Sequence, residues 1–230
     1  MNLTHSTPLT PATPVALKID FVSDVSCPWC AIGLSALEIA LKNIGDSVKV
    51  DLHFQPFELN PKMPPEGQDV TEHLTQKYGS TPAQQAQIRE SIRQRGAALG
   101  FVFRPAGRSR IYNTFDAHRL LHWAELEGKQ YALKTALLKA YFTDGDNPSS
   151  HELLVRLAGE CGLDTERAAR ILASVEFAQN VHAAEQFFLR AGISSVPAVI
   201  INDKHLISGG QPVEVFEQAL RQIAAQSQEA

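Results

Sequence analysis

The sequence predicts a mixed α/β fold in which two halves, each built of strands and a helix, are separated by a long helical segment. Two alternating apolar stretches, residues 18–23 and 48–54, flank one helical stretch near the N-terminus. Helical periodicity then dominates residues 70–191, and strand patterns return only after residue 196. The predicted order is therefore β-α-β, a helical insertion, and β-β-α.

The first half begins with residues 18–23 (KIDFVS), which alternate as a half-buried strand does. Pro28 suits the first turn of a helix, where its missing N–H costs no hydrogen bond, and apolar residues recur at helical spacing as far as Gly45. Residues 48–54 (VKVDLHF) read as the second strand. We expect this strand to run parallel to the first, because a helix lies between them.

The helical insertion carries its own start and stop signals. Thr81-Pro82-Ala-Gln84 has the form of a capping box with proline at the first helical position. Glycines follow the ends of several periodic stretches, as is common at helix C-termini. The pattern predicts helices over residues 82–99, 113–127, 130–142, 149–161, 164–173 and 174–191.

The second half starts with a short strand pattern at residues 197–202, a turn at Asp203-Lys204, and a second strand pattern at 205–208. A connection this short predicts an antiparallel hairpin. Pro212 then begins a closing helix with one apolar stripe. We divide the chain into a disordered tail (1–16), a first half (17–62), a helical insertion (63–190) and a second half (191–230).

Composition excludes several classes of protein. The chain has 230 residues, 44% of them hydrophobic, with a net charge of −4. That charge gives no basic surface for nucleic acid, and no apolar run is long enough to cross a membrane. The proline-rich start lacks the features of a secretory signal, and there are only three cysteines. We therefore expect a cytoplasmic protein without structural disulfides.

The chemistry is predicted to centre on Cys27-Pro28-Trp29-Cys30, two cysteines at the point where a strand passes into a helix. A helix N-terminus stabilises an anion, so the pKa of the Cys27 thiol should fall and Cys27 should be the nucleophile. Cys30 lies one turn further along on the same face, shielded from solvent and close enough for a disulfide. It is predicted to be the resolving thiol.

Several other residues could have either a functional or a structural role. Cys27, Cys30, His118 and His122 supply four zinc-type ligands, but almost ninety residues separate the two pairs, unlike the usual zinc spacings. Cys161 lies in an apolar helical setting and is predicted to be a buried small hydrophobe.

The sequence predicts that the charged residues of the insertion are either structural or exposed to solvent. His118 and Arg119 are predicted to hold the insertion together. We expect the basic loop with Arg104, Arg108 and Arg110 to be exposed to solvent. The alternative is that this loop binds a carboxylate, such as that of glutathione.

Four motifs together resemble the FrnE branch of the DsbA family. They are Cys27-Pro-Trp-Cys30, Phe57-Glu-Leu-Asn-Pro61, Asn113-Thr-Phe-Asp-Ala-His-Arg119, and Val196-Pro197 followed by Ser208-Gly-Gly-Gln-Pro212. The resemblance implies a thioredoxin fold, with a central mixed sheet and an all-helical insertion domain. It also implies thiol–disulfide exchange on protein or small-molecule disulfides, in the direction of reduction or isomerisation in a reducing cytoplasm.

The same resemblance implies the rest of the site. Val196-Pro197 would be a cis-proline loop facing the cysteines, and Pro28, Trp29, Val196 and Pro197 would contact the substrate. Separately from the resemblance, we expect no bound cofactor, with glutathione as an electron donor or co-substrate, and the sequence leaves open whether the protein is a monomer or a homodimer.

Two other functions remain open from the sequence. One is a glutathione-dependent isomerase or transferase, resembling 2-hydroxychromene-2-carboxylate isomerases and kappa-class transferases, which carry a serine where this chain has Cys27. The other is a peptide-binding module whose thiols are incidental.

Overall fold

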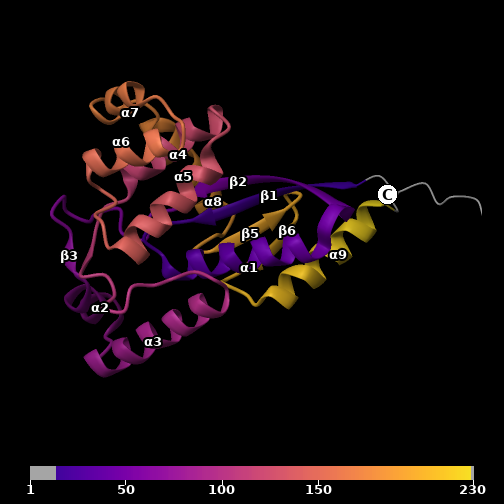
Figure 1. The fold of residues 1–230 in the computed structure, drawn as a ribbon, viewed down its shortest axis with the longest axis horizontal. Coiled ribbons are helices and arrows are strands. Elements are labelled where there is room, and N and C mark those ends of the chain that lie inside the picture. Colours follow the sequence, from indigo (N-terminus) through magenta and orange to yellow (C-terminus); the bar gives the residue numbers. More distant parts are fainter. Residues whose placement is uncertain (1–13, 229–230) are drawn as a thin grey trace, which may run out of the picture.

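The sheet at the centre of the molecule is mixed, as predicted (Figure 1). It is seen in a computed structural model that describes residues 14–228. The strand order is β2-β1-β5-β6. The strands are β1 (Val15–Ser23), β2 (Val48–Pro56), β5 (Ala198–Ile201) and β6 (His205–Ser208).

The pairing of the strands confirms the predicted topology. β1 and β2 run parallel, whereas β5 is antiparallel to both β1 and β6. β1 begins earlier than expected, since Val15 pairs with Val48 and Ala16 with Lys49. The last two residues assigned to a tail therefore belong to the sheet, and residues 1–13 of that tail lie outside the described residues.

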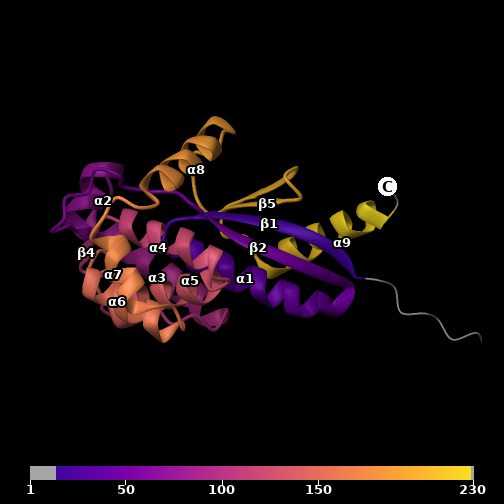
Figure 2. The ribbon, with the colours of Figure 1, turned by 90° about the horizontal axis from the view of Figure 1, so that it is seen from above.

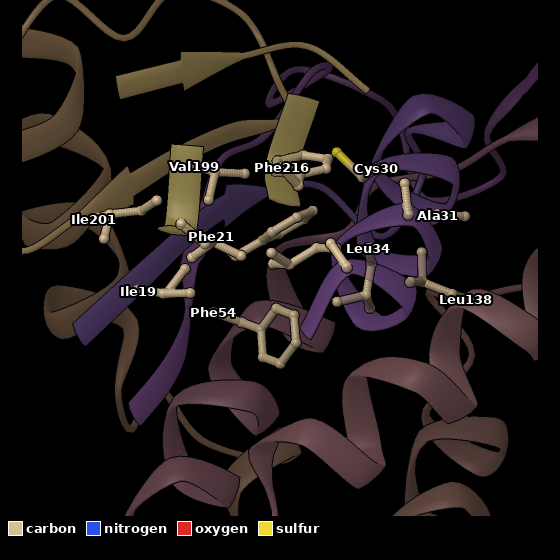
Figure 3. Close-up of a cluster of buried hydrophobic side chains, with 14 of the residues drawn as sticks. Ile19, Phe21, Cys30, Ala31, Leu34, Phe54, Leu138, Val199, Ile201 and Phe216 are labelled. Atoms are coloured by element: carbon tan, nitrogen blue, oxygen red, sulfur yellow. The ribbon is translucent and has the colours of Figure 1, made fainter. Parts of the chain in front are cut away.

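Helices cover both faces of the sheet (Figure 2). α1 (Pro28–Ile44) and α9 (Val213–Gln228) pack on one face, and α8 (Ala178–Arg190) lies on the other. Successive residues of β1 point to opposite faces of the sheet. Phe21 belongs to the apolar cluster with α1 and α9, whereas Val22 packs with residues on the α8 side. Figure 3 shows the larger cluster, in which Cys30 lies close to Phe216 and Val199.

The helical insertion gathers at one end of the sheet, beside the start of α1 (Figure 1). The capping box at Thr81 is present, with both of its hydrogen bonds. Helices α4 to α7 pack around an apolar cluster of their own. The elements are β3 (Gln68–Asp69), α2 (Val70–Tyr78), α3 (Pro82–Ala98), β4 (Arg110–Ile111), α4 (Phe115–Leu126), α5 (Gln130–Lys139), α6 (His151–Glu160) and α7 (Thr165–Leu172).

Several boundaries differ from the predicted ones. The helix expected over 130–142 ends as α-helix at Lys139 and continues as a π-helical turn, Ala140–Asp144. The helix expected from residue 174 begins at Ala178, because Phe177 adopts a left-handed conformation (φ 61°). The β3–β4 ribbon was not predicted, since strands of two residues leave no periodic signal. Among residues 14–228, no helix combines the length and apolar character needed to cross a bilayer.

Candidate active site

Cys27 and Cys30 lie at the N-terminus of α1, as the sequence predicted. Cys27 is the residue before the first helical turn, and Pro28 opens the helix. The Cys30 N–H donates to the Cys27 carbonyl at 3.1 Å, which places the two thiols one turn apart. Both are free thiols, with 3% of Cys27 and none of Cys30 exposed.

The two thiols have opposite pKa shifts. A hydrogen bond from the Cys30 thiol lowers the pKa of Cys27 more than burial raises it, and the N–H groups of Cys30 and Trp29 add to the effect. Burial raises the pKa of Cys30 well above its ordinary value, and the neighbouring Cys27 raises it further. Of the two thiols, Cys27 is thus the one that more readily forms the thiolate, which is the reactive form of cysteine.

A loop from the second half of the fold faces Cys27. The Cys27 Sγ lies 3.7 Å from the Val196 carbonyl oxygen, and the Val196–Pro197 peptide bond is cis. Gly33 of α1 allows this approach, because a Cβ there would lie 3.1 Å from Pro197 Cγ. Pro197 is buried against the helix, so Val196 presents its backbone to the sulfur.

A cavity of about 810 Å³ opens beside the sulfur of Cys27. Cys27, Pro28, Trp29 and Val196 line it together with residues of α2 and α3. Trp29 is half-buried, and the Arg95 guanidinium carbon lies 5.2 Å from the centroid of its ring. Four of the six predicted site residues thus border one cavity, Cys30 lies beneath them, and Pro197 supports the loop.

Comparison with known proteins agrees with this geometry. Residues 18–221 match the model of the DSBA-like thioredoxin domain. The chain belongs to this family. A probable DsbA oxidoreductase from Streptomyces coelicolor has a similar structure, with a TM-score of 0.84 and 35% identity over 90% of this chain and 89% of that one.

Two further proteins are similar to this DSBA-like chain at lower sequence identity. The uncharacterized protein YwbO of Bacillus subtilis is 29% identical over 208 residues, which cover 90% of this chain and 96% of YwbO. The cytosolic disulfide reductase DsbM from Pseudomonas aeruginosa, solved with glutathione, shares the fold at a TM-score of 0.60 and 17% identity, over 89% of this chain and 98% of DsbM.

The basic loop of this DSBA-like chain is not simply solvated, contrary to the expectation from sequence. The Arg108 guanidinium donates to the Ser26 carbonyl at 2.6 Å, directly before Cys27. The same group lies 5.6 Å from the ring centroids of both Tyr141 and Phe142. Arg108 is therefore held at the cavity wall. This position could not be predicted from local sequence patterns, because the partners of Arg108 lie far along the chain.

A buried carboxylate, Asp24, holds the turn before Cys27. Its oxygens accept the N–H groups of Ser26 at 2.9 Å and Leu59 at 2.7 Å, and His118 Nε2 lies 3.7 Å away, beyond a normal hydrogen bond. Burial alone would raise the pKa of Asp24, but His118 and the two N–H groups outweigh it and lower the pKa to about 2. His118 thus supports the site through Asp24.

Within residues 14–228, no three His, Cys, Asp or Glu side chains are placed to hold a metal ion, so these residues do not offer the zinc site considered from the sequence. Two further charged residues were not predicted from the sequence. Lys134 of α5 is fully buried, with its Nζ 5.8 Å from the centroid of the Phe54 ring. Glu58 is half-buried at the edge of the cavity, and its pKa is raised to about 8 by burial and by Glu185.

Cys161 is only partly buried, so the prediction of a buried hydrophobe is wrong in degree. It is the residue that ends α6, where the chain turns toward the surface. Burial and Glu160 raise the pKa of its thiol, opposite to the shift at Cys27.

This contrast predicts an order of alkylation for the reduced protein. Although Cys161 is more exposed, Cys27 should react with iodoacetamide at least about tenfold faster at pH 7, because more of it is thiolate. The rate for Cys27 should reach half its maximum below about pH 8.5, the ordinary thiol value. Peptide mass spectrometry across a pH series measures both sites, and equal rates at pH 7 would contradict the assigned shifts.

Proposed function

We propose that this DSBA-like protein is a dithiol–disulfide oxidoreductase and isomerase, with Cys27 as nucleophile and Cys30 as resolving thiol. The observation that carries the proposal is the pair of free thiols one turn apart, of which the cavity-facing one has the lowered pKa and the buried one the raised pKa. Neither a zinc site nor a pair of unreactive thiols would require one cysteine with a lowered pKa and another with a raised pKa.

The reaction follows from the two thiols. The Cys27 thiolate attacks one sulfur of a substrate disulfide, forming a mixed disulfide and releasing the other sulfur as a thiolate. Cys30 then loses its proton and attacks the Cys27 sulfur, so that the Cys27–Cys30 disulfide forms and the substrate leaves as a second thiolate. Two electrons pass from the protein to the substrate. We assign this reducing direction, and isomerisation by the first step alone, to a cytoplasmic setting.

The substrate is proposed to lie across Trp29, Pro28 and the Val196-Pro197 loop. The Val196 carbonyl beside the sulfur offers a backbone acceptor to an extended chain, in the manner of strand addition. The half-buried Trp29 ring offers an apolar surface at the cavity edge. Pro197 acts by holding Val196 in place.

A second candidate, glutathione-dependent chemistry on a small molecule, is favoured by the charge of the cavity. Within residues 14–228, the cavity-lining Lys77, Arg89, Arg104 and Arg108 have no carboxylate partner, and they suit an anionic co-substrate such as glutathione. The same feature supports glutathione as the electron donor of the first candidate. The presence of both cysteines makes the redox function the better supported one.

Trapping tests the resolving role. Cys30→Ser should still attack a disulfide through Cys27 but should accumulate the mixed disulfide, because no second thiol is present to displace the product. Oxidised glutathione and a peptide disulfide are offered to the variant separately, and intact-protein mass spectrometry identifies each adduct. The adduct should survive at least about tenfold longer than with the native pair. Failure to trap either one would contradict the proposed mechanism.

A further inference from the structure

Arg108 is a cation held beside the proposed nucleophile, and the thiol chemistry described above does not use it. Its Nη1 donates to the Ser26 carbonyl at 2.6 Å, and Ser26 is bonded to Cys27. The Cα atoms of adjacent residues are about 3.8 Å apart, so the guanidinium contacts the residue next to the thiol. Arg108 and Cys27 also line the same cavity. A disulfide bound in this cavity would have the positive charge close to the sulfur under attack.

The guanidinium of Arg108 is held in place by the protein itself. Its carbon lies 5.6 Å from the ring centroids of both Tyr141 and Phe142, within the range of a cation–π contact. The loop that carries it is fixed on the same π-helical turn. The Arg104 N–H donates to the Phe142 carbonyl at 3.0 Å, and the Tyr141 hydroxyl donates to the Arg110 carbonyl at 2.8 Å. A group ordered in this way loses little side-chain freedom on binding a ligand, which favours recognition.

Arg108 keeps charge and N–H donors available for a ligand. A guanidinium has five N–H donors in a planar fork, and the Ser26 carbonyl accepts from one of its nitrogens. Arg119 and Arg156 pair with carboxylates, whereas Arg108 has no carboxylate within ion-pair distance in residues 14–228. A carboxylate fits the fork well, because its two oxygens can accept parallel N–H bonds.

The charge of the cavity wall also suits an anionic substrate. The whole chain carries a net charge of −4, yet lysines and arginines outnumber carboxylates in the cavity lining. Of the two lining carboxylates, Glu90 is paired with Arg93 at 2.7 Å. Burial and Glu185 raise the pKa of the other, Glu58, to about 8, so it is largely uncharged at pH 7. The described wall of the cavity therefore has an excess of positive charge, which attracts a negatively charged substrate.

We propose that Arg108 selects disulfides that carry a carboxylate beside the attacked sulfur. The inference rests on the proposed function and names its substrate class. The substrate carboxylate accepts N–H bonds from Arg108 while the neighbouring sulfur lies at Cys27. The bonds that form and break are those of the thiol–disulfide exchange already described, and Arg108 neither gains nor loses a proton. An acidic peptide disulfide and glutathione disulfide share this chemistry.

Three small disulfides of different charge test the preference: dithiodipropionate is anionic, 2-hydroxyethyl disulfide is neutral, and cystamine is cationic. Acid quenching and intact-protein mass spectrometry measure the rate at which each one oxidises the reduced protein at pH 7. Arg108→Met should lower the rate with dithiodipropionate by about tenfold, because a hydrogen bond to a charged group is lost. The rate with the neutral disulfide should stay within about threefold, and the rate with cystamine should not fall. Comparing variant with native protein for each disulfide cancels its intrinsic reactivity.

The matched control is Arg156→Met, which removes the same unit of charge from an exposed site that does not line the cavity. It should leave all three rates within about twofold, because salt screens a distant surface charge. A purely structural role for Arg108 would lower the three rates together, since the turn before Cys27 would be disturbed for every substrate. An equal loss with the three disulfides, or no loss with any of them, would overturn the proposal. Neither result would affect the proposed function, which requires only that Cys27 reacts.

Arg108→Lys and the native protein keep the proposal testable if Arg108→Met does not fold. Lysine retains the charge but not the fork, so the rate with dithiodipropionate should fall by about threefold while the neutral disulfide is unaffected. In the native protein, raising the salt from about 0.05 M to about 0.5 M should slow dithiodipropionate at least about threefold relative to the neutral disulfide. A ratio that does not respond to salt would contradict the role of charge in the cavity.

Two larger substrates identify the source of the carboxylate. A peptide disulfide with glutamate next to cysteine is compared with the same peptide carrying glutamine there, and glutathione disulfide is offered separately. A native preference of at least about fivefold for the glutamate peptide that disappears in Arg108→Met would assign the site to acidic peptides. A loss confined to glutathione disulfide would assign it to glutathione. No loss with either substrate would contradict the proposal.

Discussion

Changing Cys27 to serine should abolish disulfide reduction, with a loss of at least about a thousandfold, the scale of removing a catalytic nucleophile. A serine hydroxyl at this position would not ionise near neutral pH, so the helix N-terminus and the Cys30 thiol would have no anion to stabilise. The measurement is the rate of reduction of an insulin-like or small-molecule disulfide with a thiol donor.

Cys161→Ser is the matched control for this change. Cys161 lies at the end of α6 and does not line the cavity. The Cys161→Ser protein should therefore retain the native rate of disulfide reduction within about twofold. Undiminished turnover in Cys27→Ser would refute the oxidoreductase proposal. A Cys27→Ser protein that lost disulfide turnover but isomerised a hydroxychromene substrate with glutathione would favour the second candidate.

The helical insertion contributes directly to the site. Arg108 precedes β4 and reaches the carbonyl of Ser26, and His118 of α4 lies 3.7 Å from Asp24. The insertion therefore forms part of the wall of the cysteine site, in addition to enlarging the fold. Substitutions in it are expected to alter thiol chemistry as well as stability.

This division explains how much the sequence could predict. The helix start at Cys27 and Pro28, the capping box at Thr81 and the alternating strands are local patterns, and the structure confirms them. The place of Arg108 at the cavity wall depends on a contact between residues far apart in the chain, since Arg108 and Ser26 are separated by 82 positions. A single sequence carries no signal for such pairs, because each residue looks like an ordinary helix or loop residue.

At His118 and Arg119 the structure agrees with the sequence prediction for one residue and differs for the other. The sequence predicted that they hold the insertion together, and Arg119 does so: its guanidinium donates to the Glu176 carbonyl at 2.8 Å and the Ser174 carbonyl at 2.7 Å, as well as to the Ile171 carbonyl. His118 instead serves the turn before Cys27. Two neighbours on one helix thus face different clusters, which depends on the rotation of α4 in the fold.

Arg119→Met should destabilise the protein by about 3 kcal/mol. The guanidinium is nearly buried, with 4% of its side chain exposed, and it also pairs with Asp116 at 2.8 Å. Methionine fills much of the same space but removes the hydrogen bonds to the Ser174 and Glu176 carbonyls and the ion pair with Asp116. A hydrogen bond to a charged group contributes about 1.5–3 kcal/mol. For a chain of this size the midpoint of thermal unfolding should fall by about 6–12 °C.

The matched control for Arg119→Met is Arg156→Met. Arg156 is 53% exposed and pairs with Glu160 and Asp146 on the surface, where ion pairs contribute less than about 1 kcal/mol. Urea unfolding at pH 7 compares the two variants, and a loss at Arg119 no larger than that at Arg156 would contradict a structural role for the buried guanidinium. Because Arg119 lies outside the cavity, the folded Arg119→Met protein should keep native alkylation kinetics at Cys27 well below its unfolding midpoint.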